Sequence, residues 1–372
     1  MGTDRVVVVG AGVSGLSIAR ELAADHDVVV LDAGGIAADT TSRASGMISL
    51  SLEPFDDDCE SYAREAFRDL DGTGLFSFTE RETVRLAPDG EPGNAPDGGR
   101  YLDREALLER YPDTFGELSA YAGGLVYDGT GYLDALDYAM TLKWLTESAG
   151  AGIYRDHTVE GVRVERGTVV GVDTEYGPID ADHVVYATGW RTRELLTDHV
   201  ELPIQPLRWN AIVIEPTEPL AGAPLGSDPR SRTYWRPTPQ GNVLIGGNEH
   251  LLSDPAETEM GVDPTFREAV RERVAPLLLG VAEGTLRRED CCPTADTASP
   301  DGLPIVDAPS EAPEGLVVAT GLHGRGVMLS PVVGRAVRSL VTDEPSPFPL
   351  APFELDRFAD RSPSFDYRSH WG

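Results

Sequence analysis

Lysine is almost absent from this sequence of 372 residues, where Lys143 is the only one. Acidic residues outnumber basic residues by 62 to 31, which gives a formal net charge of -31. The acidic excess is spread along the chain rather than gathered in a tail, so we interpret it as a solvated surface adapted to a high-salt cytosol. Because nucleic-acid binding needs a basic footprint, this charge argues against a nucleic-acid partner.

Long apolar runs and cysteines are also scarce. No run reaches the length of about eighteen residues that spans a bilayer, so we expect no membrane span. The N-terminus leads straight into a strand pattern and lacks the features of a secretory signal, so we expect a cytoplasmic protein. Three cysteines, Cys59, Cys291 and Cys292, are too few for a disulfide framework, and no residues show zinc-ligand spacing, so we expect no metal.

The first segment has the pattern of a βαβ unit. Residues 5–10 form a valine run that ends in glycine, as expected for a strand buried on both faces of a parallel sheet. Leu16, Ala19, Leu22 and Ala23 then repeat at helical spacing, and the segment "DVVVLDAGG" supplies a second buried strand.

The turn between this strand and helix predicts a dinucleotide site. Gly10, Gly12 and Gly15 form G-x-G-x-x-G, in which the glycines permit the turn, admit a pyrophosphate and allow close helix packing. The helix N-terminus faces the phosphates, and Asp32 follows the second strand, where it would accept a hydrogen bond from a ribose hydroxyl. The polar, small-residue segment 40–48 comes next, and it favours a long cofactor such as FAD over NAD.

Later segments predict a discontinuous α/β fold of α+β type. Residues 158–190 are typical of a β-meander that ends in a buried strand, whereas 204–250 alternate as an antiparallel sheet does. The segment "GLVVATG" returns to a parallel-type strand, and a helix is expected to begin at Pro331. We predict a Rossmann-like cofactor domain with a parallel sheet, made of residues 1–74, 135–203 and 285–372, and an antiparallel-sheet substrate domain made of residues 75–134 and 204–284.

Six segments together resemble a known family. They are "VVVVGAGVSGLSIAREL", "TTSRASGMI", "HVVYATGW", "RTYWRPTPQGNVLIGG", "SPDGLPIVD" and "ATGLHGRGVMLSP". In this order they are similar to the glycine oxidase and D-amino-acid oxidase group of FAD-dependent enzymes, which includes sarcosine oxidase and amino-acid dehydrogenases. The resemblance covers nearly the whole chain and implies a Rossmann-like FAD domain under an antiparallel substrate sheet.

The resemblance also implies which residues contact the cofactor. Val13, Ser14, Asp32 and Ala33 are expected at the adenosine and pyrophosphate. The path from pyrophosphate to flavin is expected to be lined by Thr40, Thr41, Ser45, Gly46 and Met47, and the backbone of Val159 is expected to meet the adenine. We further expect the cofactor to contact Gly189, Gly321, Gly324, Arg325, Gly326, Val327 and Met328.

Four residues are candidates for the chemistry at the flavin. The N-terminus of the helix after Gly324 would face the flavin, and Arg325 would add a full positive charge, unless it is a surface arginine beside a loop. His323 would contact the flavin or serve only in packing. Tyr234 and Arg236 are two apart in a strand and share a face, where a phenol and a guanidinium would together hold a carboxylate. The family places a substrate-binding tyrosine at Tyr234, and the alternative for both residues is packing.

Two departures from the glycine oxidase pattern leave the substrate open. Cys292 occupies the position expected to hold a carboxylate-binding arginine, and Arg325 lies one residue beyond the position of a second arginine, which Gly324 occupies. Sarcosine oxidases attach the flavin to a cysteine near this segment, which makes Cys291 or Cys292 a candidate for a covalent link, with buried inert thiols as the alternative.

The function expected from these observations is oxidation of the C–N bond of an amino acid or secondary amine. Hydride transfer to flavin N5 gives an imine that water hydrolyses, and oxygen or an electron carrier reoxidises the flavin. The alternatives are a 2-hydroxy acid or glycerol-phosphate dehydrogenase, an RNA-modifying enzyme, which the charge of -31 disfavours, and an FAD subunit that acts only in a complex. The sequence does not indicate the oligomeric state.

Overall fold

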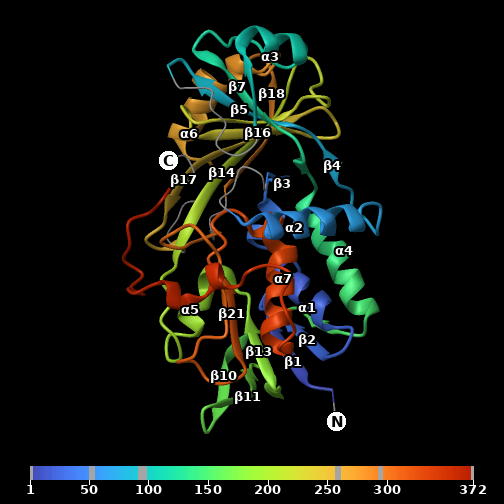
Figure 1. Ribbon diagram of the computed structural model, residues 1–372, viewed down its shortest axis with the longest axis vertical. Coiled ribbons are helices and arrows are strands. Elements are labelled where there is room, and N and C mark those ends of the chain that lie inside the picture. The colour runs from blue at the N-terminus through green and yellow to red at the C-terminus, as the bar shows by residue number, and fades with distance from the viewer. Residues whose placement is uncertain (1–2, 50–54, 91–98, 256–260, 292–295, 370–372) are drawn as a thin grey trace.

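Two sheets stacked along the long axis organise the molecule (Figure 1). The computed structural model describes residues 3–49, 55–90, 99–255, 261–291 and 296–369. The smaller, mostly parallel sheet and its helices form the lower half in Figure 1, and a larger, mostly antiparallel sheet forms the upper half. The predicted α/β class is confirmed.

The lower sheet has six strands in the order β20-β21-β13-β1-β2-β9. Every neighbouring pair is parallel except β20 with β21. The valines of β1 and β2 fill the sheet's interior, because β-branched side chains suit a strand that is covered on both faces. The strands are β1 (Arg5–Val9), β2 (Asp27–Leu31), β9 (Gly152–Tyr154), β13 (His183–Tyr186), β20 (Ile305–Asp307) and β21 (Leu316–Thr320).

Helices cover one face of the lower sheet and a meander lies at the other. Buried residues of α1, α2, α4 and α7 share one apolar core with β1 and β2, whereas residues of the three-stranded β10-β11-β12 meander join the core of the opposite face. The helices are α1 (Val13–Leu22), α2 (Asp57–Leu70), α4 (Ala135–Ser148) and α7 (Gly326–Thr342). The meander strands are β10 (Val159–Glu165), β11 (Thr168–Thr174) and β12 (Gly177–Asp180), and the short helix α5 (Thr192–Leu195) follows β13.

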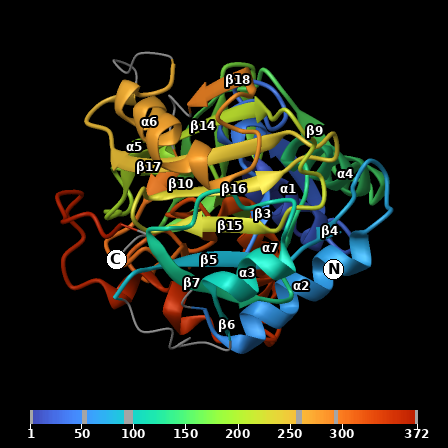
Figure 2. The same ribbon diagram turned by 90° about the horizontal axis from the view of Figure 1, so that it is seen from above.

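The upper sheet has nine strands, eight of them in the order β18-β14-β17-β16-β15-β5-β7-β6, with β19 also paired to β14. Helices α3 (Arg104–Arg110) and α6 (Pro264–Ala269) lie over its outer face (Figure 2). The strands are β5 (Thr83–Pro88), β6 (Arg100–Asp103), β7 (Tyr121–Tyr127), β14 (Gln205–Glu215), β15 (Leu225–Asp228), β16 (Thr233–Pro237), β17 (Val243–Leu251), β18 (Thr285–Cys291) and β19 (Asp296–Ala298). A small sheet of β3 (Met47–Ile48), β8 (Gly131–Tyr132) and β4 (Thr79–Glu80) lies between the halves.

One predicted domain boundary differs from the sheet pairing. The prediction assigned residues from 285 onward to the cofactor domain, yet β18 and β19 pair with β14 of the upper sheet, and the lower sheet resumes only at β20. The segment "TLRREDC" carries charged residues on both sides of the strand, so it lacks the apolar alternation that identifies a half-buried strand. The other domain limits stay predictions.

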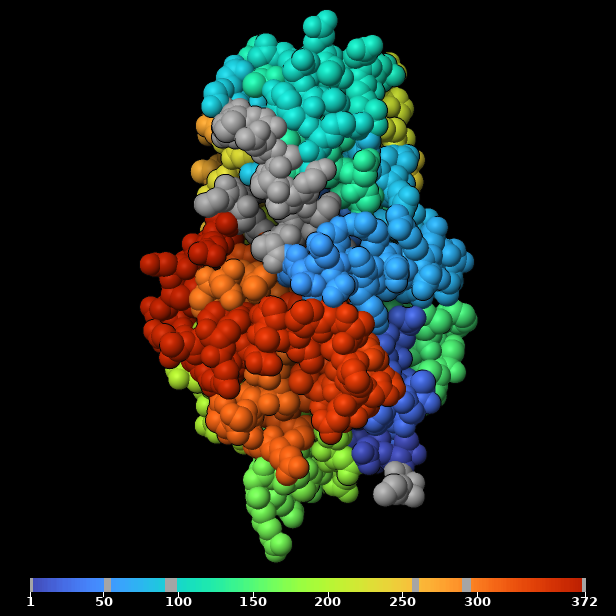
Figure 3. Space-filling model, in the orientation of Figure 1, coloured from blue at the N-terminus to red at the C-terminus, as the bar shows by residue number. Residues whose placement is uncertain are grey.

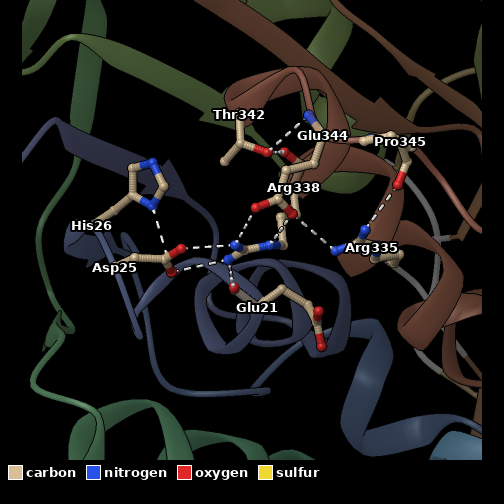
Figure 4. A network of polar contacts seen from close by, with 8 residues as sticks. All are labelled: Glu21, Asp25, His26, Arg335, Arg338, Thr342, Glu344 and Pro345. Carbon is tan, nitrogen blue, oxygen red and sulfur yellow. Dashed lines mark hydrogen bonds and ion pairs between the residues drawn. The ribbon is translucent and has the colours of Figure 1, made fainter.

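A charged network fastens the end of α7 to the turn after α1 (Figure 4). The Arg338 guanidinium donates to the Asp25 carboxylate at 2.7 and 2.9 Å, to Glu344 at 2.9 and 3.0 Å, and to the carbonyl of Glu21 at 2.8 Å. The Arg338 side chain is mostly buried, and its hydrogen bonds lower the pKa of Asp25 and of Glu344. This network fixes the C-terminal end of α7, whose N-terminal end reaches the site described below.

The C-terminal segment wraps over the lower half of the molecule (Figure 3). Its described part, which ends at residue 369, has only short 3-10 turns, and buried Phe348, Phe353 and Leu355 hold it to the core. At its end the Ser369 hydroxyl donates to a Glu249 carboxylate oxygen at 2.6 Å, and Arg232 donates to Ser369 at 3.1 Å. Among the described residues, no helix is long and apolar enough to cross a membrane.

Candidate active site

A cavity of about 890 Å³ lies between the two sheets. Its lower wall comes from the loops that follow β1, β2, β13 and β21, and its upper wall comes from β5, β14, β15 and β16. The carboxyl ends of parallel strands meet at one edge of a sheet, where α/β proteins bind their ligands. A volume of this size suits a large organic ligand.

The first glycine turn forms one end of the cavity. Gly10, Gly12, Val13 and Ser14 line it, and Gly12 is the N-cap of α1. Gly15 does not line the cavity; a Cβ there would overlap the carbonyl oxygen of Gly10, so glycine is needed for close contact of the helix with the turn. The backbone N–H groups at the start of α1 therefore face the cavity, as an anion such as a pyrophosphate requires.

Asp32 lies beside this turn, just after β2. Its Oδ2 accepts the N–H of Ala11 at 2.7 Å, and its Oδ1 accepts the N–H of Gly34 at 2.8 Å. Each carboxylate oxygen has a second lone pair, so Asp32 keeps acceptor capacity for the hydroxyls of a sugar. Asp32, Ala33 and Val159 all line the cavity at this end.

Most of the segment predicted to run beside a long cofactor borders the cavity. Thr40 and Thr41 belong to a 3-10 turn, Thr40–Arg43, and the Thr41 hydroxyl accepts the N–H of Val13 at 3.1 Å. The segment thus braces the start of α1. The five residues predicted from it that line the cavity are Thr40, Thr41, Ser45, Gly46 and Met47.

The second glycine-rich turn forms the other end of the cavity. Gly189, Gly324, Arg325, Gly326, Val327 and Met328 line it, whereas Gly321 does not. Helix α7 begins at Gly326, which corrects the predicted start at Pro331. Pro331 has no N–H for the carbonyl of Val327, and the Ser330 hydroxyl donates to that carbonyl instead, at 2.8 Å. The helix therefore runs through the proline, and its N-terminus reaches the cavity.

Arg325 is buried at the start of α7, and it lines the cavity rather than lying on the surface. Its guanidinium donates to the carbonyl of Gly302 at 2.7 Å and lies 5.7 Å from the centre of the Phe55 ring. A full charge at a helix N-terminus adds to the positive end of the helix dipole. This end of the cavity therefore favours negative charge.

Two of the residues predicted for the chemistry lie elsewhere. Arg236 does not line the cavity: its guanidinium donates to the carbonyls of Ser45 and Pro237 and lies 5.1 Å from the centre of the Tyr132 ring. His323 is also outside the lining. Its ring stacks on Tyr367 at 5.4 Å, and Nε2 lies 3.1 Å from the carbonyl of Arg368. The prediction that Arg236 holds a carboxylate together with Tyr234 is therefore wrong, because backbone carbonyls accept the hydrogen bonds of its guanidinium.

Tyr234 does line the cavity, 6.1 Å from the Trp209 ring centre. Burial raises the pKa of Tyr234 to about 12. The phenol therefore stays protonated at neutral pH and acts as a hydrogen-bond donor rather than as a base.

Asp296 is a cavity residue that the sequence analysis missed. Its carboxylate accepts the N–H of Thr297 at 2.7 Å and also the N–H of Gly324. Burial raises the pKa of Asp296 to about 6, and these two backbone donors and Arg325 lower it in part. Asp296 thus holds the second glycine turn in place, and it gives this wall a group that titrates near neutral pH.

Several other lining residues were not anticipated. The signal for them was weak, because most come from strands that are far apart in the sequence. They are Arg43, Thr83, Arg85, His157, Trp190, Arg191, Trp209, Asn210 and Ser227. Cys291 ends β18, where its backbone pairs with that of Asn210, and Cys292 lies outside the described residues, so the choice between a flavin link and inert thiols stays open.

Comparison with known proteins identifies the family. The family described as FAD dependent oxidoreductase matches residues 5–340. The chain belongs to this family. Its members' cofactor accounts for a long cavity with a helix N-terminus at each end, and the protein is an FAD-dependent oxidoreductase.

Relatives within the family include enzymes of amino-acid oxidation. The chain is 27% identical to the glycine oxidase of Geobacillus kaustophilus, across 95% of this chain and 96% of that protein. It is 26% identical to a D-amino acid dehydrogenase of Cereibacter sphaeroides, across 95% of each chain. The crystal structure of glycine oxidase from Geobacillus kaustophilus matches with a TM-score of 0.80 at 25% identity and covers 96% of this chain and all of that one.

The residues around the cavity fit FAD in this chain. Gly12 and Ser14 bring backbone amides at the start of α1 to the cavity wall, the acceptor Asp32 lies next to them, and the apolar side chains of Val327 and Met328 lie at the opposite end. A dinucleotide with a flavin needs this combination of amide donors, a sugar acceptor and an apolar ring site.

Proposed function

We propose that this enzyme oxidises the C–N bond of an amino acid or secondary amine. FAD, when bound, accepts the hydride equivalent that leaves the substrate carbon. The substrate becomes an imine, which water hydrolyses to a carbonyl compound and an amine or ammonia. The main support is the cavity wall, to which the N-terminus of α7, Arg325 and Tyr234 all contribute.

In this proposal the first end of the cavity binds the adenosine and pyrophosphate. Val13 and Ser14 contact the pyrophosphate, and the N–H of Ser14 is the donor, because the N–H of Val13 already donates to Thr41. Asp32 accepts a hydrogen bond from a ribose hydroxyl, and the backbone of Val159 meets the adenine. Thr40, Thr41, Ser45, Gly46 and Met47 line the path between the two ends. These assignments rest on the residues' places in the cavity wall and on the resemblance of the segments.

The second end of the cavity would bind the redox-active ring and the substrate. Arg325 and the N-terminus of α7 stabilise negative charge that reduction places on the ring. Tyr234 donates a hydrogen bond from the upper sheet toward the substrate, because its phenol stays protonated. Trp209, Val327 and Met328 exclude water from this end.

The decisive experiment is an anaerobic substrate screen. The protein would be purified in high salt, its visible spectrum recorded, and amino acids and amines tested for bleaching of the flavin absorption. We expect bleaching by a subset of amines or amino acids, with ammonia or a primary amine as product. Bleaching by 2-hydroxy acids or glycerol phosphate alone, without a nitrogenous product, would contradict the proposal.

The same preparation addresses the acceptor and the flavin linkage. Hydrogen peroxide release in air indicates an oxidase, whereas dye reduction without peroxide indicates a dehydrogenase. Flavin that stays attached after acid precipitation would support a link to Cys291 or Cys292. Loaded protein that is inactive with every substrate would favour a subunit that works only in a complex.

A further inference from the structure

A row of three polar residues crosses the upper wall of the cavity. In the parallel pairing of β15 with β5, Ser227 is opposite Arg85, and in the antiparallel pairing of β15 with β16, Ser227 is opposite Tyr234. Residues opposite each other in register point to the same face of a sheet, and all three line the cavity. A guanidinium, a hydroxyl and a phenol therefore project side by side from three adjacent strands.

The row is compact enough to bind one small group. Adjacent strands lie about 4.8 Å apart, so the Cα atoms of Arg85 and Tyr234 are roughly 10 Å from each other. Ser227 lies between them with a short side chain that leaves the space above it open. The two long side chains can therefore both reach a ligand over the serine.

Arg85 differs from the other arginines of the cavity wall. Arg191 forms an ion pair with Asp39 at 3.1 Å, Arg43 lies 3.9 Å from the same carboxylate, and Arg325 donates to a backbone carbonyl. Arg85 is exposed and has no hydrogen-bond or ion-pair partner among the residues that the structure describes. A guanidinium with five open donors in a cavity is suited to a planar, bidentate anion such as a carboxylate.

Tyr234 is held in place on its strand. Gly246 lies opposite Tyr234 in β17, and a Cβ at Gly246 would overlap the Tyr234 ring. The ring therefore lies across the glycine, which fixes the direction of the phenol. A second donor with a fixed position adds geometric specificity to the charge of Arg85.

Asp296 lies far from Arg85 along the upper sheet. Asp296 is on β19, which pairs with β14, and five strand steps in the order β19-β14-β17-β16-β15-β5 separate it from Arg85. At about 4.8 Å a step, Asp296 and Arg85 lie on the order of 24 Å apart along the sheet. A substrate carboxylate would thus be attracted toward Arg85 and kept from Asp296.

We propose that Arg85, with Ser227 and Tyr234, forms a carboxylate-binding subsite that selects amino acids over amines without a carboxylate. This inference rests on the proposed oxidation of a C–N bond, and it assigns the substrate's acid group to the upper sheet. It also replaces the earlier expectation for Arg236, whose guanidinium is used by backbone carbonyls. Arg85 binds substrate in this arrangement and takes no part in the redox step.

The test compares an anionic probe with its neutral analogue on flavin-loaded protein. Benzoate and benzamide would be titrated into wild type, R85Q and R85K while the flavin absorption is followed, which measures binding without turnover. We expect wild type to bind benzoate more tightly than benzamide. R85Q should weaken the binding of benzoate about 10- to 100-fold, which is the range for a hydrogen bond to a charged group, and it should leave the binding of benzamide unchanged. R85K should recover part of the loss, because the charge returns without the planar fork.

A matched control is R100Q, because Arg100 is on β6 of the same sheet but forms an ion pair with Glu82 instead of lining the cavity. R100Q should bind both probes as wild type does. S227A provides a second test at the centre of the row and should weaken benzoate by a smaller factor. Equal benzoate binding by wild type and R85Q, or no benzoate binding by wild type, would overturn the subsite.

Turnover separates this inference from the proposed function. If amino acids are oxidised, R85Q should raise KM for the amino acid far more than it lowers kcat, and it should narrow the preference for an amino acid over its amide. Oxidation of amino acids with an unchanged KM in R85Q would overturn the subsite alone. If no amine or amino acid is oxidised by wild type, the proposed function fails, and the benzoate titration still decides the subsite.

Discussion

Substitution of Asp296 by asparagine should change how the stability of the protein depends on pH. The pKa of Asp296 is raised by burial to about 6 in the folded protein, from 3.8 in an ordinary aspartate. Ionisation is thus harder in the folded state than in the unfolded state. For such an acid, ionisation lowers the stability of the folded protein. This loss is absent well below pH 3.8, grows as the pH rises from about 4 to about 6, and is complete above that range.

The size of this effect follows from the shift. A difference of about 2 pKa units corresponds to about 3 kcal/mol of lost stability above pH 6. The carboxylate faces the cavity, where water reaches it in the flavin-free protein. We therefore expect the ionisation of Asp296 to lower the free energy of unfolding by about 1 to 3 kcal/mol in total. Roughly half of this total is lost between about pH 5 and pH 8, and that part should disappear in D296N.

Urea unfolding of flavin-free protein at fixed high salt measures the effect, since bound flavin would add its own stabilisation. E344Q is the matched control, because Arg338 lowers the pKa of Glu344 and its titration falls below this pH range. E344Q should run parallel to wild type between about pH 5 and pH 8, while D296N should gain stability relative to both as the pH rises. Parallel curves for D296N and wild type would refute the reasoning.

Three further predictions concern the cofactor turn, the core and the surface. G15A should lose FAD on desalting, because the new Cβ would overlap the Gly10 carbonyl. The control G161A should keep FAD, because a Cβ at Gly161 meets nothing within 4 Å. Retention of flavin by both variants would contradict the packing argument. F67A should lower the free energy of unfolding by about 3 to 5 kcal/mol, since Phe67 is fully buried against Phe76, Phe78 and Tyr138, and urea unfolding would measure this. The thermal midpoint should rise between about 0.2 M and about 2 M KCl as salt screens the charge of -31, and a midpoint independent of salt would argue against adaptation to high salt.

The cofactor end of the site could be predicted because its signals are local. Buried valine strands, a glycine turn and an acid after the second strand all lie within 5–32, and the chain places them together through one βαβ unit. The start of α7 was misjudged for a local reason as well. Ser330 and Pro331 are typical of a helix start, but the Ser330 hydroxyl supplies the hydrogen bond that the proline lacks.

Apart from Tyr234 and Arg325, the substrate end could not be predicted, because its geometry depends on strand register. Strand alternation places Tyr234 and Arg236 on one face, yet it does not indicate that Arg236 turns toward Ser45. Arg85 is opposite Ser227 only because β5 pairs with β15 across more than a hundred residues of sequence. Neither the pairing nor its register has a signature in either segment alone.

This contrast between the two ends explains why the family is identified whereas the substrate is a proposal. The local signals belong to the part of the site that binds FAD, which the whole family shares, so they identify the cofactor but say little about the substrate. In the proposed arrangement the side chains that face the substrate come from the upper sheet, and they include Arg85, Ser227 and Tyr234 on β5, β15 and β16. Because the proposed subsite selects by the charge of a guanidinium, substrates that differ only in charge are its sharpest probes.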